Sequence, residues 1–213
     1  MPADKQKVYE TLRFEIIKND LKAGEFLNEK KLMVRFKIGR TPLREVFLRL
    51  QRAKLINMIP RQGTVVTPID FKDLREIVEI RRGLEALVGQ LAVKRLKDAH
   101  IASLKEIIKK ATNSYNNEKG SSLKDLSQYD MDFHNCMLDA IQNTRLKEML
   151  YEQQNAMGRF AWLLGLKPED FFSQFKQLED VVSALEEKNV EKVQAALQVH
   201  LDWYIDKVKN DIL

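Results

Sequence analysis

The stretch Gly39-Arg40-Thr41-Pro42-Leu43-Arg44-Glu45-Val46 decides how the first third of this chain folds. Thr41 is a good helix N-cap, and Pro42 suits the first helical position because its missing N–H would have no intrahelical partner there. Apolar residues then recur at helical spacing, as Leu43, Val46, Phe47 and Leu50. We therefore predict a helix that is capped by Thr41, begins at Pro42 and carries arginines on its exposed face.

Two further helices precede this stretch, and a hairpin follows it. Apolar residues at helical spacing predict a helix over 6–19, and Asn28 is a good N-cap for a short helix that ends near Gly39. After Lys54 the pattern is extended, with strands expected over 55–59 and 64–67 around a turn that ends at Gly63. Three helices and a β-hairpin are the parts of a winged helix-turn-helix.

The rest of the chain is helical in period. Breaks in the pattern divide it into six helices, expected over 71–91, 98–116, 122–141, 144–164, 168–187 and 190–211. An antiparallel six-helix bundle accounts for them. The predicted fold is mostly α, with one domain over 1–69 and a second over 70–213.

Charge is distributed unevenly between these two parts. Residues 1–70 hold 15 Lys and Arg against 8 Asp and Glu, whereas the remainder holds 21 against 23. A basic unit on a near-neutral body is what a protein needs if one end must neutralise phosphates, although a solvated surface would give the same count. The composition is that of a globular protein in the cytoplasm without a membrane span, and the single Cys136 excludes an intrachain disulfide.

Several basic residues are placed where a winged helix-turn-helix contacts DNA. Arg40 and Thr41 lie at the N-terminal end of the third helix, and Arg44 follows one turn later on the same face. Arg61 and Gly63 lie at the tip of the hairpin, where Gly63 permits a positive φ. For each arginine the alternative is a solubilising surface charge.

The helical part contains a candidate metal site. Asp130 and His134 are four residues apart, so they share one helix face, as two metal ligands would. His200 shares a helical stripe with Val193 and Leu197 and is expected to point into the bundle. A surface Asp-His pair and a buried neutral histidine are the alternatives to a metal.

The N-terminal motifs resemble a known family. The run over 39–46, preceded by 21–29 and followed by 61–66, strongly resembles the DNA-binding domain of the GntR family. The resemblance implies that Arg40, Thr41 and Arg44 contact operator DNA, with Lys30 and the wing around Gly63 contributing. The chain departs from the family in having Gly39 where Ser is usual and Lys54 where Gly is usual.

The C-terminal motifs resemble the FCD class of GntR effector domains, in its shorter six-helix subgroup. The segments that carry the resemblance are 79–85, 130–134 with Asn143, and 183–189 leading to His200. That class commonly binds a divalent metal, such as zinc, nickel or manganese, through one Asp and three His. The metal and a nearby Arg often hold a small carboxylate effector.

The resemblance assigns these roles to four residues of this chain and leaves one position unmatched. Asp130, His134 and His200 match three metal ligands, and Arg81 matches the effector-binding Arg. The fourth ligand position falls on Leu178, which cannot bind a metal. Either three ligands hold an ion with an open position, or Leu178, Phe171 and Phe175 fill the space of a lost metal.

The predicted function is a homodimeric transcription regulator that binds a pseudo-palindromic double-stranded operator and responds to a small effector. An alternative is a metal-dependent enzyme, with Asp130, His134 and His200 around a catalytic ion. The sequence lacks a phosphate loop or an HExxH pattern, and an enzyme would not explain the basic N-terminal part. A third alternative is an architectural DNA-binding protein whose helical body only dimerises.

Overall fold

The computed structural model describes residues 4–117 and 122–212, so part of the loop expected at 116–122 lies outside the described residues. The chain forms two compact units. Unit 1 comprises Met1–Arg75 and Tyr151–Leu163, and unit 2 comprises Glu76–Leu150 and Leu164–Leu213. The boundary between the two domains expected over 1–69 and 70–213 stays a prediction.

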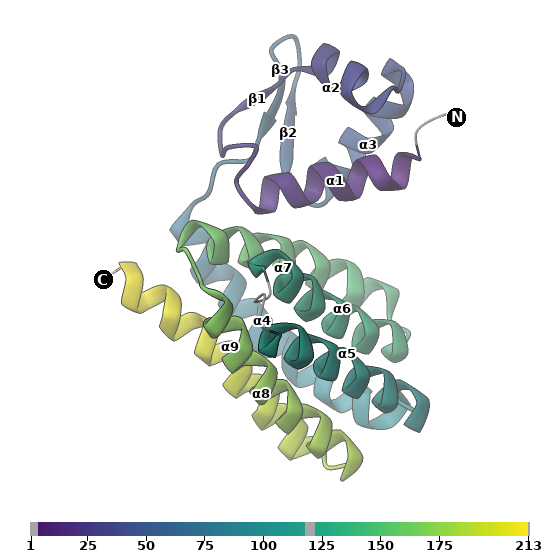
Figure 1. Ribbon diagram of the computed structural model, residues 1–213, viewed down its shortest axis with the longest axis vertical. Helices are drawn as coiled ribbons and strands as arrows, with labels where there is room; N and C mark the ends of the chain where they lie inside the picture. The colour runs from purple at the N-terminus through teal and green to yellow at the C-terminus, as the bar shows by residue number, and fades with distance from the viewer. Residues whose placement is uncertain (1–3, 118–121, 213) are drawn as a thin grey trace. The chain divides into compact units, whose positions relative to one another are not determined.

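The three N-terminal helices are α1 (Lys5–Ile17), α2 (Glu29–Phe36) and α3 (Arg40–Arg52), as predicted (Figure 1). Asn28 caps α2, since its side chain accepts a hydrogen bond from the backbone N–H of Lys31 at 3.0 Å. Such a bond satisfies one of the donors that every helix leaves unpaired at its N-terminus.

The predicted cap of α3 was wrong by two residues. The helix begins at Arg40, and its N-cap is Gly39, which has extended backbone angles and no side-chain cap bond. Thr41 is therefore the second helical residue and Pro42 the third. Proline is tolerated here because none of the first-turn N–H groups has an intrahelical acceptor.

Three strands form the sheet of unit 1, one more than the predicted hairpin. They are β1 (Phe26–Leu27), β2 (Ile56–Ile59) and β3 (Gly63–Val66), in the order β1-β3-β2 and antiparallel throughout. β1 pairs Phe26 with Val65. Two residues are too few to show an alternating pattern in sequence, which is why β1 was missed.

The core of unit 1 joins these helices to the sheet. Its most deeply buried side chains are apolar and include Leu12, Phe47, Leu50 and Ile56. The second half of α7 belongs to this unit and packs on α1. Arg13 is 2% exposed and donates from Nε to Oδ1 of Asn155 at 2.8 Å.

Unit 2 contains the helices of the predicted bundle. Their bounds are α4 (Phe71–Arg95), α5 (Asp98–Asn116), α6 (Leu123–Ile141), α7 (Thr144–Leu163), α8 (Pro168–Glu186) and α9 (Val190–Ile212), within two residues of prediction except at the end of α4. Helix α4 starts and α7 ends in unit 1. The predicted fold class is confirmed.

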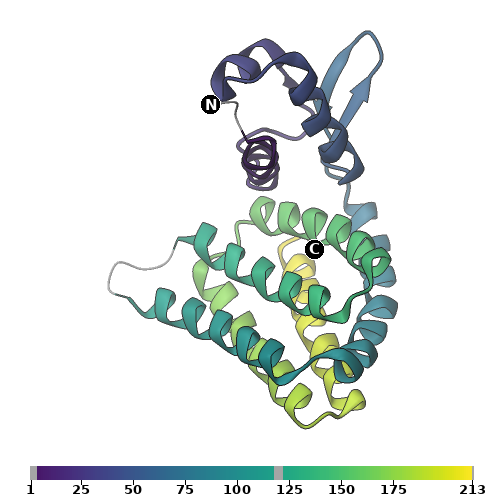
Figure 2. The same cartoon turned by 90° about the vertical axis from the view of Figure 1, so that its right-hand side faces the viewer.

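Inside unit 2, α8 packs against α5, α6 and α9, and α5 packs against α6 (Figures 1 and 2). Phe133, Phe175 and Leu178 are almost completely buried in this core. Among the described residues, no helix is both long and apolar enough to cross a membrane.

Candidate functional site

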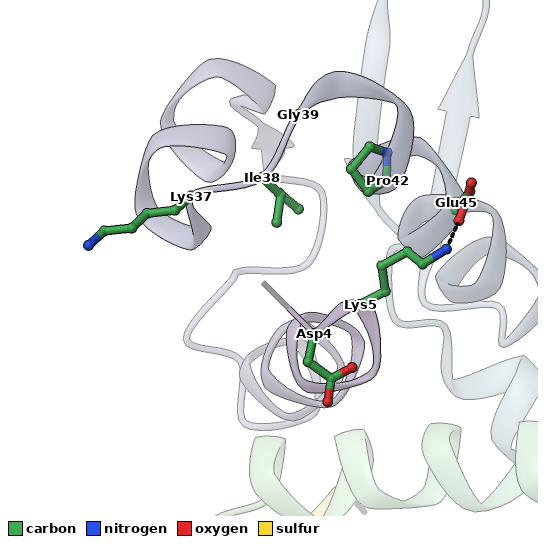
Figure 3. A pocket seen from close by; sticks show the side chains of 7 residues that line it. All are labelled: Asp4, Lys5, Lys37, Ile38, Gly39, Pro42 and Glu45. Atoms are coloured by element: carbon green, nitrogen blue, oxygen red, sulfur yellow. Dashed lines mark hydrogen bonds and ion pairs between the residues drawn. The ribbon is translucent and has the colours of Figure 1, made fainter. Parts of the chain in front are cut away.

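The turn between α2 and α3 sets the direction of α3. Lys37 ends α2 in the left-handed conformation, Ile38 is buried, and Gly39 leads into α3. Figure 3 shows this turn beside the start of α1, where Lys5 forms an ion pair with Glu45 of α3. Buried apolar residues on both sides of the turn, among them Leu32, Ile38 and Leu43, therefore hold the helix-turn-helix together with contacts to α1.

The predicted DNA-contacting residues all lie on the surface of unit 1. Arg40, Thr41 and Arg44 are exposed on α3, Lys30 is exposed on α2, and Arg61 is exposed at the hairpin. The guanidinium of Arg40 lies 3.9 Å from Glu29, at the limit of an ion pair. In the part of the chain that the structure describes, Lys30, Arg44 and Arg61 have no ion pair or hydrogen bond from their side chains.

Other arginines of unit 1 are already engaged inside it. Arg35 forms a bidentate pair with Glu15, and Arg49 lies 4.0 Å from the ring centroid of Tyr9 and donates to Gln6 at 2.8 Å. Helical position alone did not show that the side chains of Arg49 and Arg44 differ in their contacts. The structure does, because only Arg49 is held against α1.

The hairpin tip requires unusual backbone angles at two residues. Arg61 has a φ of 63° and Gly63 a φ of 125°. The positive φ expected at Gly63 is confirmed, although Gly63 is the first residue of β3 rather than part of the turn. The tip presents Arg61, Gln62 and Gly63 to solvent.

Asp130, His134 and His200 come together inside unit 2. Each offers one ligand atom, and the three atoms all lie within 4.8 Å of one another. Nε2 of His134 is 3.6 Å from Oδ1 of Asp130, and the two imidazole centroids are 5.4 Å apart. The structure thus brings the three predicted ligands to one place, and His200 points into the bundle as expected.

Burial sets the protonation of this cluster. Desolvation lowers the pKa of His134 to about 3, and the positive charge of Arg81 adds to the shift. Desolvation also lowers the pKa of His200 to about 3, and it raises the pKa of Asp130 to about 7 against the opposing effect of Arg81. Both imidazoles are therefore neutral at pH 7, which is the form that binds metals.

The cluster also contains unsatisfied polar atoms. Oδ1 of Asp130 and Nδ1 of His200 are buried and have no hydrogen-bond partner among the described residues. An unpaired buried polar atom costs about 1–3 kcal/mol. Two donors bound to zinc at about 2.1 Å are roughly 3.5 Å apart, so the 3.6 Å between Asp130 and His134 fits a shared ion.

Arg81, the predicted effector-binding residue, is buried beside the cluster and ion-paired with Glu85 one turn along α4. Its charge lowers the pKa of both His134 and His200. Glu85 was not predicted to have a role, although an Arg and a Glu four residues apart on a helix signal such a pair.

Leu178, at the unmatched ligand position, is fully buried on α8. Phe171 and Phe175 are buried on the same helix. This face of α8 is apolar, which agrees both with an ion held by three ligands and with a lost metal. The three candidate metal ligands therefore lie on α6 and α9.

Comparison with known proteins identifies both parts. The family model "Bacterial regulatory proteins, gntR family" matches residues 4–66, and that of the FCD domain matches residues 76–202. This chain belongs to the GntR family and carries an FCD domain. It is accordingly a DNA-binding transcription regulator with a winged helix-turn-helix, and its family consists of regulators rather than enzymes.

Individual GntR-family relatives cover nearly the whole chain. The transcriptional repressor RspR of Escherichia coli is 26% identical over 96% of this chain and 89% of its own. The gluconate operon transcriptional repressor of Bacillus subtilis is 26% identical over 93% and 82%. The solved structure of E. coli McbR/YncC superimposes with a TM-score of 0.83 at 24% identity over 97% of each chain, which shows the shared fold.

Proposed function

We propose that this GntR-family regulator binds a pseudo-palindromic operator as a dimer and that a small carboxylate effector changes its affinity for DNA. Residues 1–69 would bind the operator, and residues 70–213 would bind the effector and dimerise. Such a role places the protein in the bacterial cytoplasm. The proposal rests chiefly on the exposed and unpaired basic side chains of Lys30, Arg44 and Arg61.

DNA recognition would divide these residues into two classes. Arg40 and Arg44 on α3 would enter the major groove, where an arginine fork can read guanine. Lys30, Thr41 and the wing at Arg61 and Gly63 would contact the phosphate backbone and fix the register of α3. The ion pair of Arg40 with Glu29 is long and exposed, so a phosphate or a base can replace it at little cost.

Fluorescence anisotropy on an operator selected from a random library tests this assignment. Replacing Arg40 or Arg44 by Ala should weaken binding about 10- to 100-fold and relax the sequence preference. Lys109→Ala, an exposed charge on α5 of unit 2, is the matched control and should leave binding unchanged. Full sequence preference in the doubly substituted protein would refute the assignment.

We further infer that Asp130, His134 and His200 hold a divalent metal ion. Support comes from their three converging ligand atoms and from the unsatisfied Asp130 and His200. When bound, such an ion would supply positive charge that attracts a carboxylate. Arg81 would hold a second oxygen of that carboxylate, in competition with Glu85.

Metal analysis and thermal melting test this site together. Protein stripped with EDTA and reloaded with zinc, nickel or manganese should bind about one ion per chain, and His200→Ala should abolish binding. A panel of mono-, di- and tricarboxylates should then raise the melting temperature of the loaded protein, and Arg81→Met should remove that shift. An unchanged melting temperature with every carboxylate would refute the effector class.

A further inference from the structure

Helix α1 contacts both α3 and the second half of α7, Tyr151–Leu163, which belongs to unit 1. Toward α3, the ring of Tyr9 supports Arg49, whose guanidinium lies 4.0 Å from the ring centroid. Toward α7, the hydroxyl of Tyr9 lies 3.3 Å from the hydroxyl of Tyr151. One buried side chain of α1 therefore links the helix predicted to read DNA to a helix that is remote in sequence.

The contacts of α1 with α7 form three successive pairs. Their numbers rise together along both helices, so α1 and α7 run parallel, and spacings of three and four residues keep each set on one helix face. We call the six residues the α1–α7 seam, and they pair as Tyr9 with Tyr151, Arg13 with Asn155, and Ile17 with Gly158.

The centre of the α1–α7 seam is a buried polar contact. Arg13 is 2% exposed and Asn155 is fully buried, and Nε of Arg13 donates to Oδ1 of Asn155 at 2.8 Å. The same guanidinium lies 4.9 Å from the ring centroid of Tyr151. A planar guanidinium meets an amide oxygen and a ring face in one arrangement only, whereas apolar side chains tolerate sliding. This contact therefore fixes the register of α1 against α7.

A glycine permits the close approach of the two helices at the end of the α1–α7 seam. Gly158 lies in the interior of the 20-residue α7, where glycine is less favourable than alanine. A Cβ atom at this position would lie 3.2 Å from Cγ2 of Ile17, closer than an ordinary van der Waals contact. The packing of α1 thus accounts for a residue that the helix itself disfavours.

Arg159 attaches α7 to a second element of unit 1. It is 6% exposed, and its Nη2 donates to the backbone carbonyl of Thr67, the residue that follows β3. Among the described residues no carboxylate forms an ion pair with Arg159, and burial lowers its pKa to about 10. A buried charge is costly unless it is held. Helix α7 therefore contacts the strand that carries the wing as well as α1.

From these contacts we propose that the second half of α7 positions the DNA-binding elements, with the α1–α7 seam holding α1 and thereby fixing the orientation of α3 through Tyr9 and Arg49. Residues 151–163 are then part of the DNA-binding unit, although they lie within the FCD match. The proposal deepens the proposed function, because it rests on α3 reading the operator and names the residues that position it. Helix α7 begins in unit 2, so an effector that shifts this helix changes operator affinity.

Replacing the polar centre of the seam tests the proposal. Arg13→Met with Asn155→Leu removes both polar groups together, so no buried charge is left unpaired. The dissociation constant for the selected operator should rise about 10-fold, as for one mismatched base pair. Affinity for a non-specific duplex should stay unchanged, because every exposed basic residue remains. Leu163→Ala, on the same helix at a residue that is 44% exposed, is the control and should change neither affinity.

A rescue experiment separates positioning from stability. Gly158→Val forces α1 away from α7 and should also weaken operator binding about 10-fold. Adding Ile17→Ala makes room for the valine and should restore operator affinity. Ile17→Ala also removes buried apolar surface and should lower the melting temperature. Recovered operator binding in a less stable protein can therefore come only from restored positioning.

A disulfide across the α1–α7 seam tests whether the contact persists on DNA. In a Cys136→Ser background, Ile17→Cys with Gly158→Cys places two thiols at the closest approach of the helices. The oxidised protein should bind the operator as tightly as the reduced protein, since the proposal requires a closed seam in the bound form. Mass spectrometry after alkylation confirms the cross-link.

The outcomes separate this proposal from the proposed function. Unchanged operator affinity in the Arg13 and Asn155 double variant and in Gly158→Val overturns the positioning role of α7, and so does loss of operator binding on oxidation. In either case, weaker binding by the Arg40 and Arg44 variants would leave the proposed function standing. If those variants also kept full sequence preference, the proposed function would fail independently of the seam.

Discussion

His134 on α6 and His200 on α9 lie with their imidazole centroids 5.4 Å apart, and both side chains are buried. Two protonated imidazoles at this distance would repel each other and lack solvation. The neutral forms are therefore strongly preferred in the folded protein. We therefore expect the cluster that they form with Asp130 to make the free energy of unfolding depend on pH and on metal ions.

Metal-free protein should become more stable as the pH rises from about 4.5 to 6. His134 and His200 have folded-state pKa values of about 3, below the unfolded value of 6.5, so only the unfolded chain protonates them in this window. Asp130, with a pKa of about 7 against 3.8 unfolded, acts in the opposite direction. Two histidines outweigh one aspartate, giving a rise of about 1.4 kcal/mol per pH unit in the free energy of unfolding. Urea unfolding in EDTA measures it.

His200→Gln provides the control for this pH dependence. One histidine then opposes one aspartate, so the free energy of unfolding should be nearly flat between pH 4.5 and 6. A slope in the variant equal to that of the wild type would show that other groups set the pH dependence.

Leu178→His should increase zinc affinity. It adds the ligand type that the family resemblance places there, and one ligand of four accounts for a quarter of a zinc-binding free energy of about 10–16 kcal/mol, or roughly 100-fold or more in affinity. Competition with a chromophoric chelator measures the change. Leu178→Gln buries a polar group of similar size without an imidazole, and an equal gain in that control would contradict the prediction.

Glu85→Ala should destabilise the protein by about 3–5 kcal/mol, because it removes the carboxylate that is ion-paired with the buried charge of Arg81. Arg81→Met combined with Glu85→Leu removes both charges and should cost much less. Urea unfolding of the three proteins at pH 7 compares them. A single variant within 1 kcal/mol of the wild type would mean that Arg81 does not depend on Glu85.

Lys54→Gly should stabilise unit 1 by about 0.5–1 kcal/mol. Lys54 follows α3 with a φ of 57° and an exposed side chain, a conformation that strains residues with a Cβ. The usual Gly at this position of the family has the same physical reason. Lys54→Ala keeps the Cβ and should show no such gain in thermal melting.

The sequence predicted the local parts of this protein well, since helix periodicity and capping are properties of short segments. The bounds of α5 through α9 follow from breaks in a 3.6-residue pattern, and Asn28 caps α2 as expected. Errors arose where local signals were weak: β1 has only two residues, and Pro42 is tolerated at more than one place in the first turn.

The candidate metal site likewise combines features that the sequence predicts with features that depend on packing. The spacing of four residues placed Asp130 and His134 on one helix face, and the apolar stripe around His200 predicted that it faces the interior. Three candidate ligands could therefore be named from the sequence. Tertiary structure alone decided that these atoms converge within 4.8 Å, that the Arg81–Glu85 pair is buried beside them, and that Arg49 is held on Tyr9 while Arg44 is left exposed. Periodicity determines which side of a helix a residue occupies, whereas distances between helices depend on packing contacts that are remote in the chain.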